Sequence, residues 1–144
     1  MSKKKIEAIA LRIKGEYYRR QKEYVLAIEY FERSMAISEE IQDKHELTLI
    51  SNLIAICYQD QYNYKRAHEY YIMGLAISKE LGDKGLIADI YNRIGLNYYY
   101  QGDFSQNALI NFEKANHLYK EMENKRELAN MNTTIGAIYF HQGN

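Results

Sequence analysis

Two asparagines in the sequence have the chemistry to bind a peptide backbone. Asn92 lies 40 positions after Asn52, and each side-chain amide has an acceptor oxygen and a donor nitrogen. One such amide can pair with both the C=O and the N–H of an extended peptide. The alternative is that each asparagine binds water or a neighbouring helix. Their spacing indicates that a repeating element positions them.

Residue types that can catalyse reactions are present, but they are not arranged for catalysis. The histidines are His45, His68, His117 and His141, and no two have the i, i+4 spacing of a helical zinc site. Glycine-rich phosphate loops and the Gly-x-Ser-x-Gly motif do not occur. Cys57, the single cysteine, has apolar neighbours, which favours an inert buried thiol over a nucleophile. We therefore expect a non-enzyme with no metal and no other cofactor.

The composition limits the class of partner and the compartment. Lys plus Arg and Asp plus Glu each number 19, so the net charge is zero; a nucleic-acid or anionic-membrane partner would favour a basic surplus. We read residues 2–5, Ser-Lys-Lys-Lys, as a solvated helix entrance rather than a targeting signal. No apolar run approaches a membrane span, and one cysteine cannot form an internal disulfide. The expectation is one cytoplasmic domain, residues 1–144.

Four classes of position repeat at intervals of 40 or 41 residues. Small residues recur at Gly15, Ala55, Gly95 and Gly136, and tyrosines follow at Tyr18, Tyr58, Tyr98 and Tyr139. Alanines recur at Ala27, Ala67 and Ala108, and aromatic residues follow at Phe31, Tyr71 and Phe112. Chance recurrence among 15 tyrosines does not explain why four classes of position recur at the same interval. An internal repeat of two-helix units explains it.

Apolar periodicity and caps predict the helices of each unit. We expect helices over 5–21, 24–41, 44–61, 64–81, 84–101, 104–122 and 125–141. Gly82 suits a left-handed C-cap, and Asp43 to Glu46 and Asn124 to Glu127 resemble capping boxes. The extra residue of the third unit falls between Phe104 and Ala108.

The repeated small residues predict close helix contacts. A glycine inside a helix costs about 1 kcal/mol relative to alanine, so a repeated one indicates that a second backbone lies close. We expect the recurring alanines to supply the matching small surface on the second helix, and the tyrosine one turn further on to fill the wedge between the helices.

The register resembles the tetratricopeptide repeat over essentially the whole chain. The best copy is Tyr91-x2-Ile94-Gly95-x2-Tyr98, followed by Ala108-x3-Phe112. The resemblance implies an all-α, right-handed α-solenoid of about seven helices. Its repeats would span residues 5–41, 44–81 and 84–122, with a partial repeat at 125–144. The 40-residue length and the lack of proline resemble bacterial peptide-pheromone receptors, Rap-type phosphatases and sensor kinases, and some animal scaffold adaptors. HEAT repeats share the length but not the register.

The resemblance also implies that a concave groove, lined by the first helix of each repeat, binds a protein or peptide. A rotation of about 100° per residue places these residues on it: Arg12, Glu16, Arg19, Asn52, Ile56, Gln59, Asp89, Asn92, Leu96, Tyr99, Thr133 and Phe140. Groove asparagines of the pheromone receptors bind peptide backbone, which suggests that role for Asn52 and Asn92. Tyr99 and Phe140 are candidate apolar anchors, or they pack against the adjacent unit. Glu16 and Asp89 do not suit the carboxylate clamp of chaperone adaptors.

Three functions remain open at this point. The first is a protein-binding or peptide-binding scaffold, and the second is the sensory module of a bacterial signalling regulator. The chain stops at a turn after the first helix of its fourth unit, so we expect a fragment of a longer protein; alternatively, helix 125–141 caps the array. If that helix is unprotected, its face of Ile135, Ile138 and Tyr139 offers a third function, a homodimer contact.

Overall fold

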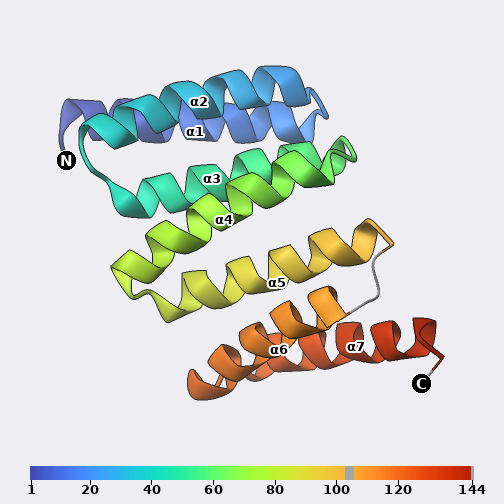
Figure 1. Ribbon diagram of the computed structural model, residues 1–144. Helices are drawn as coiled ribbons and strands as arrows, with labels where there is room; N and C mark the ends of the chain where they lie inside the picture. The colour runs from blue at the N-terminus through green and yellow to red at the C-terminus, as the bar shows by residue number, and fades with distance from the viewer. Residues whose placement is uncertain (103–105, 144) are drawn as a thin grey trace. The chain divides into compact units, whose positions relative to one another are not determined.

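The computed structural model describes residues 1–102 and 106–143, which contain seven α-helices and no strand (Figure 1). The helices are α1 (Lys3–Arg20), α2 (Tyr24–Glu40), α3 (Lys44–Asp60), α4 (Tyr64–Leu81), α5 (Lys84–Tyr100), α6 (Gln106–Glu121) and α7 (Lys125–His141). The all-α expectation is confirmed, and the helix bounds differ from the predicted ones by at most two residues. Phe104, and with it the position of the extra residue, lies outside the described residues.

The helices group into two compact units. Unit 1 is Met1–Leu81 and unit 2 is Gly82–Asn144. In unit 1, α1 pairs with α2 and α3 pairs with α4, while α3 also packs on α2 and approaches α1. In unit 2, α6 packs on both α5 and α7. A single domain over the whole chain stays a prediction.

Side chains cap the start of five helices. Ser2, Asp43, Asn63, Asp83 and Asn124 each accept a hydrogen bond from the backbone N–H three residues on. The caps predicted at Asp43 and Asn124 are therefore confirmed. Burial alone would raise the pKa of Asp43, but the bond from the Glu46 N–H and the nearby Lys5 ammonium outweigh it and lower that pKa. The Ser2 cap explains why α1 begins earlier than predicted.

Every described helix is followed by a residue in the left-handed region. Glycine takes this position after α4, α5 and α7, and the predicted cap at Gly82 has φ 68°. The other four helices are followed by Lys22, Gln42, Tyr62 and Glu123, with φ between 55° and 63°. A side chain in this conformation costs about 1–2 kcal/mol, whereas glycine adopts it freely.

Glycine at two of these turns is expected to stabilise the protein. Gln42→Gly and Glu123→Gly should each raise the free energy of unfolding by about 0.5–1 kcal/mol, because relief of the strained φ exceeds the added entropy of the unfolded chain. Urea unfolding followed by circular dichroism measures the change. Gly82→Ala is the matched control and should lose stability. A lower midpoint for Gln42→Gly would contradict the expectation.

An aromatic ring of the second helix covers the small residue of the first helix. A Cβ built on Gly15 would lie 2.6 Å from the Phe31 ring, and one built on Gly95 would lie 2.7 Å from the Phe112 ring. The predicted close contact is therefore present, and the nearest atoms of the second helix belong to the aromatic ring. Ala27, like Ala67 and Ala108, is fully buried.

The tyrosine one turn after the small residue stacks on a second tyrosine in unit 1. The Tyr18 and Tyr30 rings lie 5.4 Å apart at 7°, and the Tyr58 and Tyr70 rings lie 5.8 Å apart at 20°. The Arg66 guanidinium lies 5.3 Å from the centroids of both rings of the second pair. The predicted wedge is thus filled by a pair of rings rather than by one.

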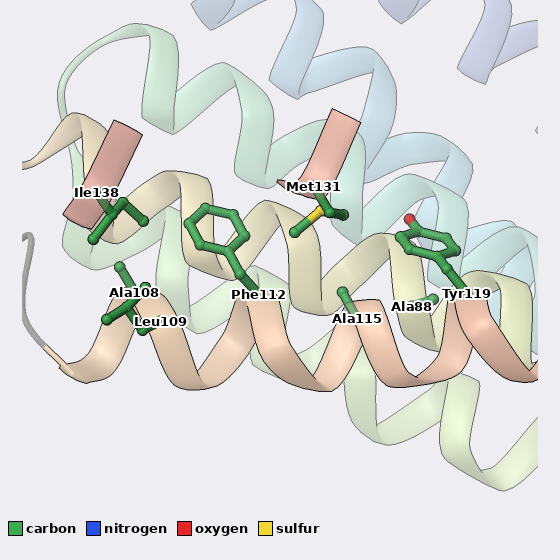
Figure 2. Packing of buried hydrophobic residues seen from close by; sticks show 8 residues of the cluster. All are labelled: Ala88, Ala108, Leu109, Phe112, Ala115, Tyr119, Met131 and Ile138. Atoms are coloured by element: carbon green, nitrogen blue, oxygen red, sulfur yellow. The ribbon is translucent and has the colours of Figure 1, made fainter. Parts of the chain in front are cut away.

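The core of unit 2 forms where α6 meets its two neighbours. Figure 2 shows Phe112 and Tyr119 of α6 beside Met131 and Ile138, which point from α7 toward α6. Met131 is 1% exposed and Ile138 is fully buried. Of the face considered for a homodimer contact, Ile138 is therefore covered by α6, and the homodimer itself stays a prediction.

Candidate functional site

In unit 1, an ion pair joins Arg12, on the predicted binding face of α1, to Glu46 of α3. Arg12 Nε donates to Glu46 Oε2 at 2.8 Å, and a second guanidinium N–H donates to Glu46 Oε1 at 3.3 Å. The Arg12 side chain is 20% exposed and that of Glu46 is 7% exposed. A two-point contact of this kind fixes both side chains. Arg12 therefore connects two neighbouring helices and is not an open cation.

The sequence analysis did not identify Glu46 as the partner of Arg12. It recognised Glu46 only as the last residue of a capping box. A signal was available, because the equivalents of Arg12 in the next two units are uncharged asparagines. A half-buried arginine at that position requires an anion nearby. Glu16 lies 3.9 Å from Arg12 and 3.6 Å from Arg20, and 28% of its side chain is exposed. Glu16 is thus the accessible carboxylate of this face.

Asn52 is more deeply buried than a groove residue is expected to be. Its residue exposure is 9%, and its Oδ1 is buried without a hydrogen-bond partner. That oxygen lies 3.0 Å from the Cβ position of Gly74, on α4. The amide oxygen is therefore directed at the neighbouring helix α4, and the peptide-binding role of Asn52 stays a prediction. Its equivalent, Asn92 on α5, is half-buried.

The remaining predicted residues of unit 1 lie toward the ends of α1 and α3. Ile56, Gln59 and Arg19 are half-buried. Gln59 Oε1 accepts a hydrogen bond from the Tyr71 hydroxyl at 3.0 Å. Burial raises the pKa of Asp60, although Arg19 and Lys22 counteract it. This end of unit 1 is a mixed-charge surface rather than a strongly basic one.

Cys57 has the properties expected of an inert thiol. It is fully buried on α3, and burial raises its pKa to about 12. At neutral pH it is protonated, and a protonated thiol is a poor nucleophile.

In unit 2, Asp89 and Leu96 are among the predicted residues that contact the core. Tyr119 donates from its hydroxyl to Asp89 Oδ1 at 2.6 Å, and burial together with this bond raises the pKa of Tyr119. Leu96 packs against the cluster around Phe112. Asp89 is exposed apart from this bond, so it can also meet a ligand.

The predicted apolar anchors differ in their surroundings. Tyr99 packs against the unit 2 core, and its ring lies 6.1 Å from the His141 ring of α7. Phe140 is 81% exposed, and its ring lies 6.0 Å from that of His141. Thr133 is exposed and donates from its hydroxyl to the Ala129 carbonyl at 3.1 Å. Phe140 is thus the more accessible of the two predicted anchors.

The described part of the chain lacks two features. Among residues 1–102 and 106–143, no three histidine, cysteine, aspartate or glutamate side chains gather in a way that could hold a metal ion. Over the same residues, every helix is too short or too polar to traverse a bilayer.

Comparison with known proteins decides the family. The tetratricopeptide repeat model matches residues 6–80, just over half of the chain. The chain belongs to the tetratricopeptide repeat family. In the terms of this family, α1, α3, α5 and α7 are the first helices of their repeats, and α2, α4 and α6 are the second helices. No curated protein sequence matches the chain significantly.

Solved structures with the same fold cover nearly all of this tetratricopeptide repeat chain. BtubC from P. vanneervenii is 21% identical over 99% of the chain, with a TM-score of 0.87. Aspartyl phosphate phosphatase F from Bacillus subtilis is 18% identical over 99%, with a TM-score of 0.92. A Rap protein complexed with Competence and Sporulation Factor is 20% identical over 99%, with a TM-score of 0.85.

These similarities confirm the fold class predicted from the sequence, an α-solenoid of tetratricopeptide repeats. The chain spans 59%, 37% and 40% of the lengths of the three solved chains.

Proposed function

We propose that this tetratricopeptide repeat chain is a non-catalytic, cytoplasmic scaffold that binds a protein segment or peptide on the faces of its first helices. The observation that carries the proposal is the repeat itself. It brings α1 and α3 together in unit 1 through the Arg12–Glu46 contact of 2.8 Å, so equivalent positions of the first two repeats lie on neighbouring helices. The similarity to a Rap protein complexed with Competence and Sporulation Factor supports the proposal.

The accessible groups of these faces suit a polar, extended segment of mixed charge. In unit 1 the Glu16 carboxylate is 28% exposed, while Arg12 is held by Glu46. In unit 2 the half-buried Asn92 can donate to and accept from a peptide backbone, and exposed Asp89 lies on the same helix face. A strongly acidic segment is a poor fit, because the most accessible groups include carboxylates.

Binding can be tested with peptides selected on the wild-type chain from a random peptide library. Asn92→Ala is expected to weaken their binding about tenfold or more, because a bound backbone would lose two hydrogen bonds. Asn52→Ala should have a smaller effect, since its Oδ1 is directed at Gly74. Isothermal titration calorimetry measures both affinities. The double variant tests whether the two losses of binding free energy add.

Gln106→Ala is the matched control, an exposed amide at the start of a second helix. It should leave affinity unchanged, and all variants should keep the helicity and melting temperature of the wild type. Equal affinities for Asn92→Ala and the control would show that the peptide does not use this face.

A second candidate function, the sensory module of a signalling regulator, is favoured by the 0.92 TM-score to an aspartyl phosphate phosphatase. It requires that a bound peptide change the conformation of the chain. Small-angle scattering of the chain with and without a selected peptide distinguishes the two functions: a scaffold keeps its scattering profile, whereas a sensory module changes it.

A further inference from the structure

The outer groove between α5 and α6 contains an apolar pocket within unit 2. Its volume is about 570 Å³, and all of its lining residues belong to these two paired helices (Figure 1). Ile87 and Tyr91 of α5 and Leu118 of α6 are half-buried and form its floor. Ile110 borders the pocket and is 41% exposed. Tyr91 lies about 100° from Asn92 around α5, so the pocket is on a different face from the proposed peptide-binding residues.

The third repeat differs from the first two in this outer groove. Counted from the recurring alanine of each second helix, Ile110 takes the position of Glu29 and Glu69. Both glutamates are exposed, and in the second repeat the position stays open although α3 packs on α2. Stacking of the repeats therefore does not account for an isoleucine there. Of the three positions only this one is apolar, and it extends the apolar floor of the pocket to the surface.

Lys114 gives the pocket an available positive charge. Its ammonium lies 5.3 Å from the centroid of the Tyr91 ring. Within residues 1–102 and 106–143, no carboxylate forms an ion pair with it. Glu113 also lines the pocket, but it lies about 100° from Lys114 around α6, on the side turned away from α5. A ligand carboxylate near Tyr91 would therefore complete an ion pair beside an apolar floor.

The histidine of the pocket, in contrast, is already paired. His117 Nε2 lies 3.2 Å from Glu121 Oε1, and the same carboxylate accepts a hydrogen bond from Lys84 Nζ at 3.2 Å. The His117 side chain is 74% exposed, and with Ile110 it leaves the pocket open to solvent. A free small molecule is normally enclosed over most of its surface, which this pocket does not allow. It suits a side chain that a larger partner surface delivers.

We propose that this outer pocket binds a segment of another protein in which an apolar side chain stands next to an acidic residue. The apolar side chain rests on Tyr91 and Leu118, and the carboxylate pairs with Lys114. This ligand differs from the one proposed for the first-helix faces, where the most accessible groups include carboxylates. Because the pocket and those faces lie on different sides of α5, one chain can hold two protein segments at the same time.

The probe is the peptide acetyl-Gly-Phe-Asp-Gly-amide, titrated into the isotope-labelled wild-type chain and followed by the NMR shifts of the backbone amides of α5 and α6. A matched peptide with asparagine in place of aspartate has the same shape but no charge, and it should bind about threefold more weakly. A second peptide with alanine in place of phenylalanine should bind about tenfold more weakly or worse. The two comparisons test the carboxylate and the apolar side chain separately.

Variants of the chain place the binding in this pocket. Ile110→Glu gives the third repeat the residue of the other two, and it should weaken binding of the aspartate peptide about tenfold or more. Ile13→Glu is the matched control, because Ile13 is likewise exposed, at 59%, and belongs to unit 1; it should leave the affinity unchanged. In Lys114→Met the aspartate and asparagine peptides should bind equally, whereas a purely structural role of Lys114 would weaken both alike.

Several outcomes would overturn the proposal. One is equal affinity of the wild-type chain for the aspartate and asparagine peptides, and another is binding that survives Ile110→Glu. Absence of any shift in α5 and α6 has the same meaning. A dimer seen by analytical ultracentrifugation and abolished by Ile110→Glu would assign the pocket to a second copy of the chain. Phenylpropionate bound as tightly as the aspartate peptide would assign it to a free carboxylic acid.

Discussion

Gly95→Leu is expected to lower the free energy of unfolding by about 1–3 kcal/mol, because it overpacks the contact between α5 and α6. A Cβ added at this position would lie 2.7 to 2.9 Å from three atoms of the Phe112 ring. The ring is fully buried and cannot move aside without disturbing the unit 2 core. Chemical denaturation followed by circular dichroism measures the loss.

Gly136→Leu is the matched control in the same unit. The residue type and the helical setting are the same, but a Cβ built on Gly136 would have no neighbour within 4 Å. Leucine should raise stability there by up to about 1 kcal/mol, since it favours the helix more than glycine does. The difference between the free energies of unfolding of the two variants measures the cost of overpacking against Phe112. A neutral Gly95→Leu would refute the close contact with Phe112.

The second large effect is expected at the ion pair between α1 and α3. Arg12→Met should cost about 2–4 kcal/mol, because it leaves the Glu46 carboxylate unpaired while 7% of that side chain is exposed. In the double variant Arg12→Met/Glu46→Leu most of this cost should disappear, as no charge remains buried. Urea unfolding of the wild type, both single variants and the double variant completes the cycle.

Arg20→Met provides the comparison with an exposed charge. Arg20 lies 3.6 Å from Glu16, but its side chain is 72% exposed. Its removal should change stability by less than about 0.5 kcal/mol. If Arg12→Met were equally mild, Arg12 would not be held by Glu46 in solution and would be available to a ligand.

Much of the fold could be predicted from local chemistry. Apolar periodicity and the caps at Asp43 and Asn124 located the helices, because these signals depend on residues only a few positions apart. The repeat then assigned the helices to pairs. It also identified Gly15 and Gly95 as contact points, since a glycine there has a cost that only close packing offsets.

The details of contact between helices could not be predicted in the same way. Periodicity shows which side of a helix is buried, but not which atom of the partner lies over it, so the Phe31 ring was missed in favour of Ala27. The Arg12–Glu46 pair depends on the relative height of α1 and α3, which no local pattern encodes. The rotamer of Asn52 depends on the space left by Gly74 on α4.

The buried thiol of Cys57 gives unit 1 a reporter of its own opening. Because the side chain is fully covered and its pKa is about 12, a thiol reagent can modify it only when α3 separates from its neighbours. No competing cysteine exists in the chain. The modification rate therefore follows the transient exposure of the Cys57 region under native conditions, without any engineered label.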